Sequence, residues 1–83
     1  MIIITDHARQ RIIERVKCHN FKVQKVTEKA LKSKEPIRES FLKKREFNGY
    51  KGVEYRLFHG CVFVFNIEEN KAICITCLVY DKK

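Results

Sequence analysis

Apolar and polar residues follow two periods along this chain, a helical period in the first third and a strand period in the last third. Within residues 5–16, Ala8, Ile12 and Val16 recur every four positions, and Ile13 widens the stripe. This spacing is typical of an amphipathic helix with one face toward a core. We therefore expect a helix that begins at the start of this segment and ends near residue 17.

The two predicted helix starts carry polar capping residues. Thr5 or Asp6 is suited to accept hydrogen bonds from the first turn, and Asn20 is suited to do the same for a second helix. The second helix is predicted from Phe21 to about residue 33, because Pro36 disfavours helical backbone just before it. Its apolar stripe is Val23, Val26, Thr27, Ala30 and Leu31, and its lysines Lys22, Lys25, Lys29 and Lys32 lie outside that stripe.

From Val53 the pattern changes to a period of two, which is typical of strands. Residues 53–58 alternate, His59 and Gly60 form a tight turn, and residues 61–65 are apolar on both faces, as in a central strand. Residues 72–80 form another apolar strand after a polar turn. Residues 2–4 predict either an edge strand or a lead-in to the first helix, and residues 37–48 predict an extended strand or an irregular crossing segment, followed by a glycine-bracketed loop.

These elements predict one α+β domain that spans residues 1–83. Two N-terminal helices should pack on one face of a twisted, three- to four-stranded antiparallel sheet, because neither layer can bury its apolar side alone. The opposite face of the sheet is expected to be partly open.

The net charge of +8 and the isoelectric point near 9.5 point to a polyanionic partner. Nucleic acid is preferred over a membrane, because the basic residues are dispersed and no apolar run approaches the ~20 residues of a spanning helix. The short apolar start does not resemble a signal peptide. We therefore expect a cytoplasmic protein with reduced thiols.

The four cysteines favour buried thiols over a metal site or a disulfide. Cys74 and Cys77 have a Cys-x-x-Cys spacing, but residues three apart on a regular strand point to opposite faces. Paired acidic residues suited to a catalytic divalent metal are also lacking in the sequence. No metal and no cofactor are therefore expected.

Three polar residues, His7, Arg11 and Arg15, form a ridge along the flank of the first apolar stripe. Such a ridge is either an ordinary solvated face or the lining of a groove. The chemistry that suits it is attack of an RNA 2′-hydroxyl on the adjacent phosphodiester, which needs a base, an acid and cations at the phosphate. His7 would serve as base or acid and Arg11 would hold the phosphate, with Thr76, Tyr80 or His59 donating from the sheet.

The chain also resembles a known group of domains. The segment Thr-Asp-His-Ala-x-x-Arg-x-x-x-Arg at residues 5–15, a second helix, and a glycine-punctuated hairpin that ends in Ile75-Thr76 are similar to small bacterial and phage domains of unknown function. Those domains are regarded as distant relatives of the RelE/ParE and BrnT-like toxins. The link between the two helices and residues 37–48 depart from their pattern.

The resemblance implies a RelE-like fold and either an RNA-cleaving toxin or a catalytically silent derivative. His7, Arg11, Arg15 and Thr76 match by motif, and Tyr80 is added from its position in the last strand. The leading hypothesis is a metal-independent endoribonuclease in which Arg15, Lys51, Arg56 and the lysines of the second helix bind RNA. The alternatives are a non-enzymatic module that binds nucleic acid or an acidic antitoxin-like or host protein, and a small phage-encoded inhibitor of a host enzyme.

Overall fold

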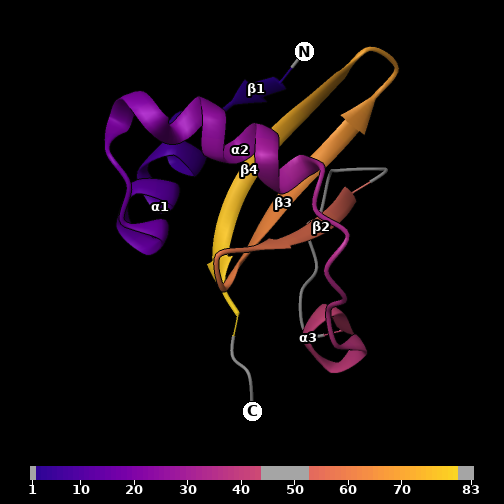
Figure 1. Cartoon of the computed structure of the whole chain (residues 1–83). Helices are drawn as coiled ribbons and strands as arrows, with labels where there is room; N and C mark the ends of the chain where they lie inside the picture. Colours follow the sequence, from indigo (N-terminus) through magenta and orange to yellow (C-terminus); the bar gives the residue numbers. More distant parts are fainter. Residues whose placement is uncertain (1, 44–52, 81–83) are drawn as a thin grey trace.

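The fold, seen in a computed structural model that describes residues 2–43 and 53–80, consists of helices followed by a sheet (Figure 1). The α+β class predicted from the sequence is confirmed. In chain order the elements are β1 (Ile2–Ile4), α1 (Asp6–Val16), the 3₁₀ turn η1 (Asn20–Lys22), α2 (Val23–Leu31), α3 (Glu39–Lys43), β2 (Val53–Phe58), β3 (Cys61–Glu68) and β4 (Lys71–Val79).

The four strands form one mixed sheet in the order β1-β4-β3-β2. The three-stranded antiparallel meander is as predicted. The residues 2–4 form an edge strand, but β1 pairs with β4 in parallel, so the sheet is mixed rather than purely antiparallel. The next strand along the chain, β2, lies at the opposite edge of the sheet from β1.

The start of α1 is fixed by a threonine that also contacts the sheet. Thr5 is the N-cap, and its hydroxyl accepts a hydrogen bond from the Ala8 backbone N–H at 3.0 Å. The same hydroxyl lies 3.3 Å from the carbonyl oxygens of Cys74 and Ile75, so it can donate to β4. One side chain thus caps the helix and sets its position on the last strand.

The predicted cap of the second helix is wrong. The helix α2 begins at Val23, after η1, and Lys22 at its N-cap makes no capping bond with its side chain. The Asn20 side chain instead accepts a hydrogen bond from Arg9 Nη1 at 2.9 Å. This contact ties the turn between the helices to α1.

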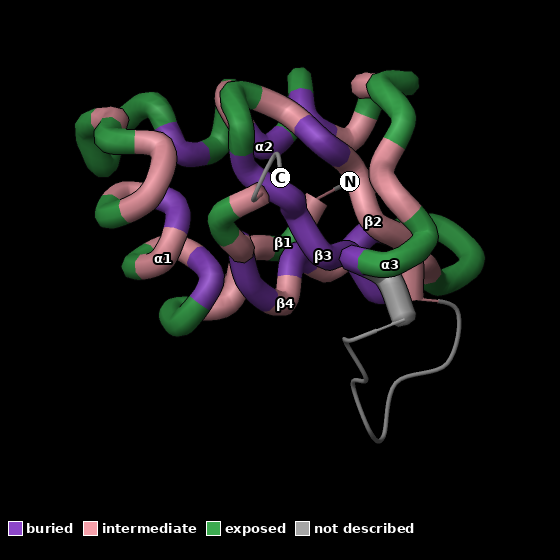
Figure 2. Tube along the Cα trace, turned by 90° about the horizontal axis from the view of Figure 1, so that it is seen from below, coloured by how far each residue is buried: buried purple, intermediate pink, exposed green. Residues whose placement is uncertain are grey.

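Two hydrophobic clusters lie on the two faces of the sheet. The larger cluster lies between α1, α2 and the sheet, and its largest fully buried side chains include Ile12, Phe63 and Phe65. The smaller one contains Phe41 of α3 with Leu57 and Val62. The central strand β3 is buried over its first six residues because it faces both clusters (Figure 2).

The segment 39–43 differs from the prediction. It forms the short helix α3 instead of a strand or an irregular crossing, and Phe41 on this helix covers part of the second face of the sheet. The glycine-bracketed loop and residues 44–48 of the predicted segment lie outside the described residues.

Candidate functional site

The ridge on α1 is present, but two of its three residues have partners within the protein. His7 is exposed. Arg11 pairs with Glu14 at 2.9 Å on the helix surface. Arg15 donates from Nη1 to the Cys77 carbonyl at 2.7 Å, so it joins α1 to β4. This partly buried contact makes Arg15 a structural residue of the helix–sheet interface.

The predicted sheet partners of the ridge lie on the other face of the sheet. Thr76 is opposite Val64 in the register and is 6 % exposed, and Val64 shares its face with Val62 of the smaller cluster. Tyr80 packs on that cluster, where the centroid of its ring lies 5.2 Å from the centroid of the Phe41 ring. The structure therefore does not bring His7 and Arg11 together with Thr76 and Tyr80.

The tyrosine hydroxyl is also engaged. The Tyr80 hydroxyl accepts a hydrogen bond from the Arg38 backbone N–H at 3.2 Å, and the Arg38 guanidinium carbon lies 4.8 Å from the centre of the ring. These contacts connect the end of the last strand to the segment that leads into α3. They give Tyr80 a structural role that its position in the sequence did not reveal.

Of the two remaining predicted RNA-binding residues, the structure describes Arg56, and its guanidinium is engaged within the protein. Arg56 donates to the Leu31 carbonyl at 3.2 Å and pairs with Glu54 at 3.0 Å, so it links β2 to the end of α2. Lys51 lies outside the described residues.

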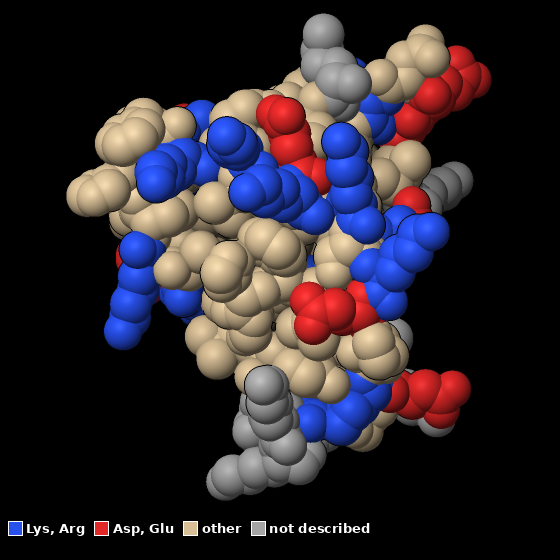
Figure 3. All heavy atoms as spheres, viewed as in Figure 1, with Lys and Arg blue, Asp and Glu red and all other residues tan. Residues whose placement is uncertain are grey.

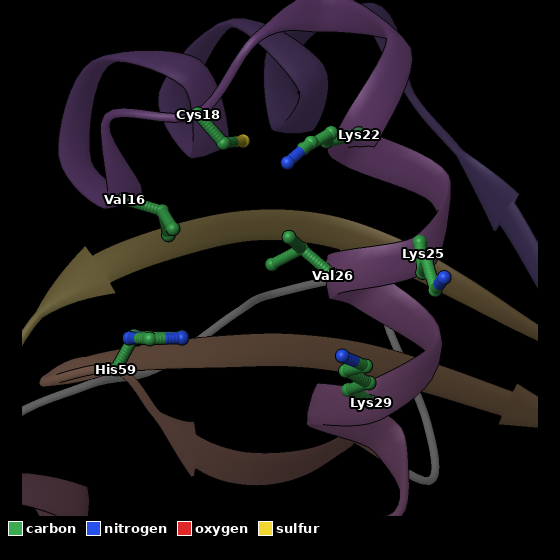
Figure 4. Close-up of a pocket in the computed structure, with 7 residues that line it drawn as sticks. All are labelled: Val16, Cys18, Lys22, Lys25, Val26, Lys29 and His59. Carbon is green, nitrogen blue, oxygen red and sulfur yellow. The ribbon is translucent and has the colours of Figure 1, made fainter.

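A different set of residues converges on one groove. A cavity of about 400 Å³ opens between the end of α1, the first two turns of α2 and the turn that joins β2 to β3 (Figure 4). Val16 and Val26 form its apolar floor, with Cys18 and Lys22 at one end and His59 and Lys29 at the other. The full lining is Val16, Cys18, Lys22, Lys25, Val26, Lys29 and His59, which we call the basic groove.

The lysines of the basic groove are exposed. Lys22, Lys25 and Lys29 are spaced at i, i+3 and i+7 along α2, so they form one stripe. Among the described residues, none of the three takes part in a salt bridge. Lysine and arginine side chains gather over the band that α2 occupies, with few acidic side chains among them (Figure 3).

This stripe opposes the intrinsic preferences of the helix. The first turn of α2 contains no acidic residue, although the positive end of a helix dipole favours one. Lys25 and Lys29 are like charges at i, i+4, which destabilises a helix by a few tenths of a kcal/mol, about 0.2–0.5. A local arrangement that costs stability without a structural gain is typical of a functional surface.

The histidine of the groove sits on a strained turn. His59 has φ of +53° and Gly60 has φ of +69°, as a two-residue hairpin requires at both central positions. Glycine adopts this conformation freely, whereas histidine does so at some cost. The predicted tight turn is confirmed, and it presents the His59 imidazole to the groove (Figure 4).

The cysteines differ in access. Cys18 is half-buried in the basic groove, whereas Cys61, Cys74 and Cys77 are buried, which confirms the predicted burial. Burial raises the pKa of the Cys74 thiol to about 12 and raises the pKa of Cys77 as well. Of the four thiols, Cys18 is the one that reagents in water can reach.

Cys74 and Cys77 do not point to opposite faces of the sheet, so the prediction from their spacing is wrong. A β-bulge interrupts the register between Val64 and Phe65, where the residue after Cys74 is the extra one, so Cys74 and Cys77 both face the larger cluster. Among residues 2–43 and 53–80, no cluster of His, Cys, Asp or Glu has the arrangement of a metal site.

The sequence indicates the lysines of the second helix and His59 separately, and it does not indicate that they line one groove. The i, i+3, i+7 spacing of the lysines was the available signal. Within the described part of the chain, no helix is of the length and apolarity that a membrane crossing needs. Comparison with protein-family models, with curated proteins and with solved structures found no match. The resemblance to the toxin families therefore stays a prediction.

Proposed function

We propose that this domain binds nucleic acid, with RNA as the first candidate, through the phosphate backbone along the basic groove. The observation that carries the proposal is the convergence of Lys22, Lys25 and Lys29 on one groove, with no acidic partner for them among the described residues. Three cations that the fold leaves unneutralised attract a polyanion. The net charge of +8 adds a long-range field that favours the same ligand.

Backbone binding of this kind has a quantitative signature. Each lysine that neutralises a phosphate releases a condensed counterion, so the logarithm of the affinity falls linearly with the logarithm of the salt concentration. Three contacts predict a slope of about −2 for a single strand and about −3 for a duplex. Removal of one contact should reduce the slope by about 1.

The position of the other candidate residues favours binding over cleavage. A metal-independent ribonuclease needs its base, acid and phosphate-holding group around one scissile phosphate. His7 and Arg11 lie on the helix α1, whereas Thr76 is nearly buried and Tyr80 is held by Arg38 and Phe41 on the other face of the sheet. The helix packs on one face of the sheet and Tyr80 packs on the other, which disfavours action of both sets on one phosphate.

The test is a fluorescence-anisotropy titration of a labelled RNA at several salt concentrations. Lys25→Gln and Lys29→Gln should each weaken binding and reduce the salt slope. Lys71→Gln is the matched control. Lys71 is the first residue of β4, it does not line the groove, and its one salt bridge among the described residues is with Glu68. The proposal is overturned if the control weakens binding as much as the groove variants do.

The same samples test the two competing functions. RNA incubated with the protein in chelator should remain intact, and cyclic-phosphate ends that disappear with His7→Ala would show the endoribonuclease instead. Lack of any salt-sensitive affinity for RNA or DNA, combined with tight binding to an acidic peptide, would favour the protein-binding alternative.

A further inference from the structure

An aromatic pair lies in the short segment between Cys18 and Lys22, two residues that line the basic groove. The rings of His19 and Phe21 stack in parallel, with centroids 5.5 Å apart and an interplanar angle of 5°. Phe21 is 78 % exposed, the largest exposed fraction among the exposed large hydrophobic side chains of the described residues. It contributes almost nothing to either hydrophobic cluster.

Single exposed phenylalanines are ordinary on protein surfaces and carry no information alone. This one differs because the turn that bears it is held in place. Arg9 Nη1 donates to Asn20 Oδ1 at 2.9 Å, and the Lys22 backbone N–H donates to the His19 carbonyl at 2.9 Å. The ring pair is therefore presented on an ordered 3₁₀ turn, with Asn20 between the two aromatic residues bonded back to α1.

The neighbours of the pair supply the second half of a nucleotide site. Phe21 immediately precedes Lys22, and Cys18 on the other side of the pair also lines the basic groove. A base that stacks on an aromatic ring keeps its own phosphates within a few ångströms of it, where a lysine ammonium can reach them. Aromatic rings interleaved with cations are the arrangement that binds single strands, because every base has a face to stack.

We infer that the stacked pair His19 and Phe21 is a platform for an unpaired nucleobase, so the ligand of the basic groove is single-stranded rather than duplex nucleic acid. The inference rests on the proposed function, since the lysines must hold the backbone while the ring holds the base. In a duplex the faces of the bases are covered by their neighbours, and the platform has nothing to stack on.

The test compares a single-stranded RNA with a duplex of equal phosphate count, using wild-type protein, Phe21→Ala, Phe21→Leu and Phe21→Trp. Loss of one base–aromatic stack should weaken single-strand binding about 5- to 150-fold in the Ala and Leu variants, with the salt slope unchanged. Phe21→Trp should retain the affinity. Val79→Ala is the control, because Val79 is another exposed apolar side chain, 58 % exposed, and it does not line the groove.

The tryptophan variant gives a second, independent readout. The chain contains no tryptophan, so residue 21 would carry the only indole. Stacking on a base should quench its fluorescence as single-stranded RNA is added, and an oligonucleotide with abasic positions should quench much less.

The two proposals fail differently. Equal binding of wild type and Phe21→Leu to the single strand, with Lys25→Gln still weakened, overturns the platform and leaves the basic groove. Equal affinity for the single strand and the duplex overturns the platform as well. Lack of any effect of the lysine variants overturns the proposed function itself.

Discussion

Reversal of the charge at Lys25 should make the protein more stable while it weakens nucleic-acid binding. Lys25 is exposed in the first turn of α2, where the helix dipole disfavours a cation, and it lies one turn before Lys29. In Lys25→Glu the dipole interaction becomes favourable, worth about 0.3–1 kcal/mol. The like-charge pair with Lys29 also becomes an oppositely charged i, i+4 pair. Loss of the repulsion and gain of the attraction each contribute about 0.2–0.5 kcal/mol.

The sum is an increase of about 1 kcal/mol in the free energy of unfolding at low ionic strength. For a domain of this size that increase raises the melting temperature by about 4–8 °C. The assay is thermal unfolding followed by circular dichroism at low and at 0.5 M salt, where screening should remove most of the gain. RNA affinity, measured on the same samples, should fall.

The control for this prediction is Lys71→Glu, which lowers the net charge by the same amount. It replaces the pair with Glu68 at 3.4 Å by two like charges, so it should destabilise slightly where Lys25→Glu stabilises. Equal stabilisation by both variants would mean that overall charge, not the lysine stripe, sets the effect. A Lys25→Glu protein that is no more stable than wild type at low salt would refute the reasoning.

Three further outcomes follow from the same contacts. His59→Asn should leave stability unchanged or raise it by about 0.5 kcal/mol, since Asn-Gly suits this turn better, and any loss of RNA binding in a fully folded His59→Asn then reports the imidazole itself. Thr5→Val should lower the free energy of unfolding by about 1–2 kcal/mol in urea melts, because it removes both the cap of α1 and the contacts with β4; a loss below measurement error would contradict the double role of this hydroxyl. The stability of the wild type should fall as the pH rises from about 9 to 12, because the unfolded Cys74 thiol ionises at its ordinary pKa while the raised pKa keeps the folded thiol protonated; Cys74→Ala should lose less stability over this range, and an identical pH dependence would contradict the assignment.

Local signals in the sequence predicted most of the fold. The cap at Thr5 or Asp6, the stripe through Ile12 and the His59-Gly60 turn each depend on neighbours a few residues away, so they can be read from one stretch of chain. The helix α3 could not be read this way, because five residues are too short to show a helical period. The bulge after Cys74 depends on pairing with β3. The strand itself was predicted correctly, but because of the bulge the predicted directions of the Cys74 and Cys77 side chains were wrong.

The candidate site was harder to predict because its residues come from three elements. In the sequence nothing indicates that Arg15 and Tyr80 have partners within the protein. Those partners, Cys77 and Arg38, are distant in the chain, so only the fold shows that both residues are engaged. The basic groove combines the end of α1, one stripe of α2 and a hairpin turn. The helical period predicts that the lysines of α2 form one stripe. No pattern in the sequence predicts that this stripe lies opposite His59.

The most direct test of nucleic-acid binding in the basic groove uses the thiol that lies inside it. Cys18 is half-buried in the groove while the other three cysteines are buried, so a small alkylating reagent should modify Cys18 first in the native protein. Saturating single-stranded RNA should slow the alkylation of Cys18 in proportion to occupancy, and Lys25→Gln should require more RNA for the same protection. RNA that is bound at saturation, as judged by anisotropy, while Cys18 reacts at its unprotected rate would show that the nucleic acid lies elsewhere.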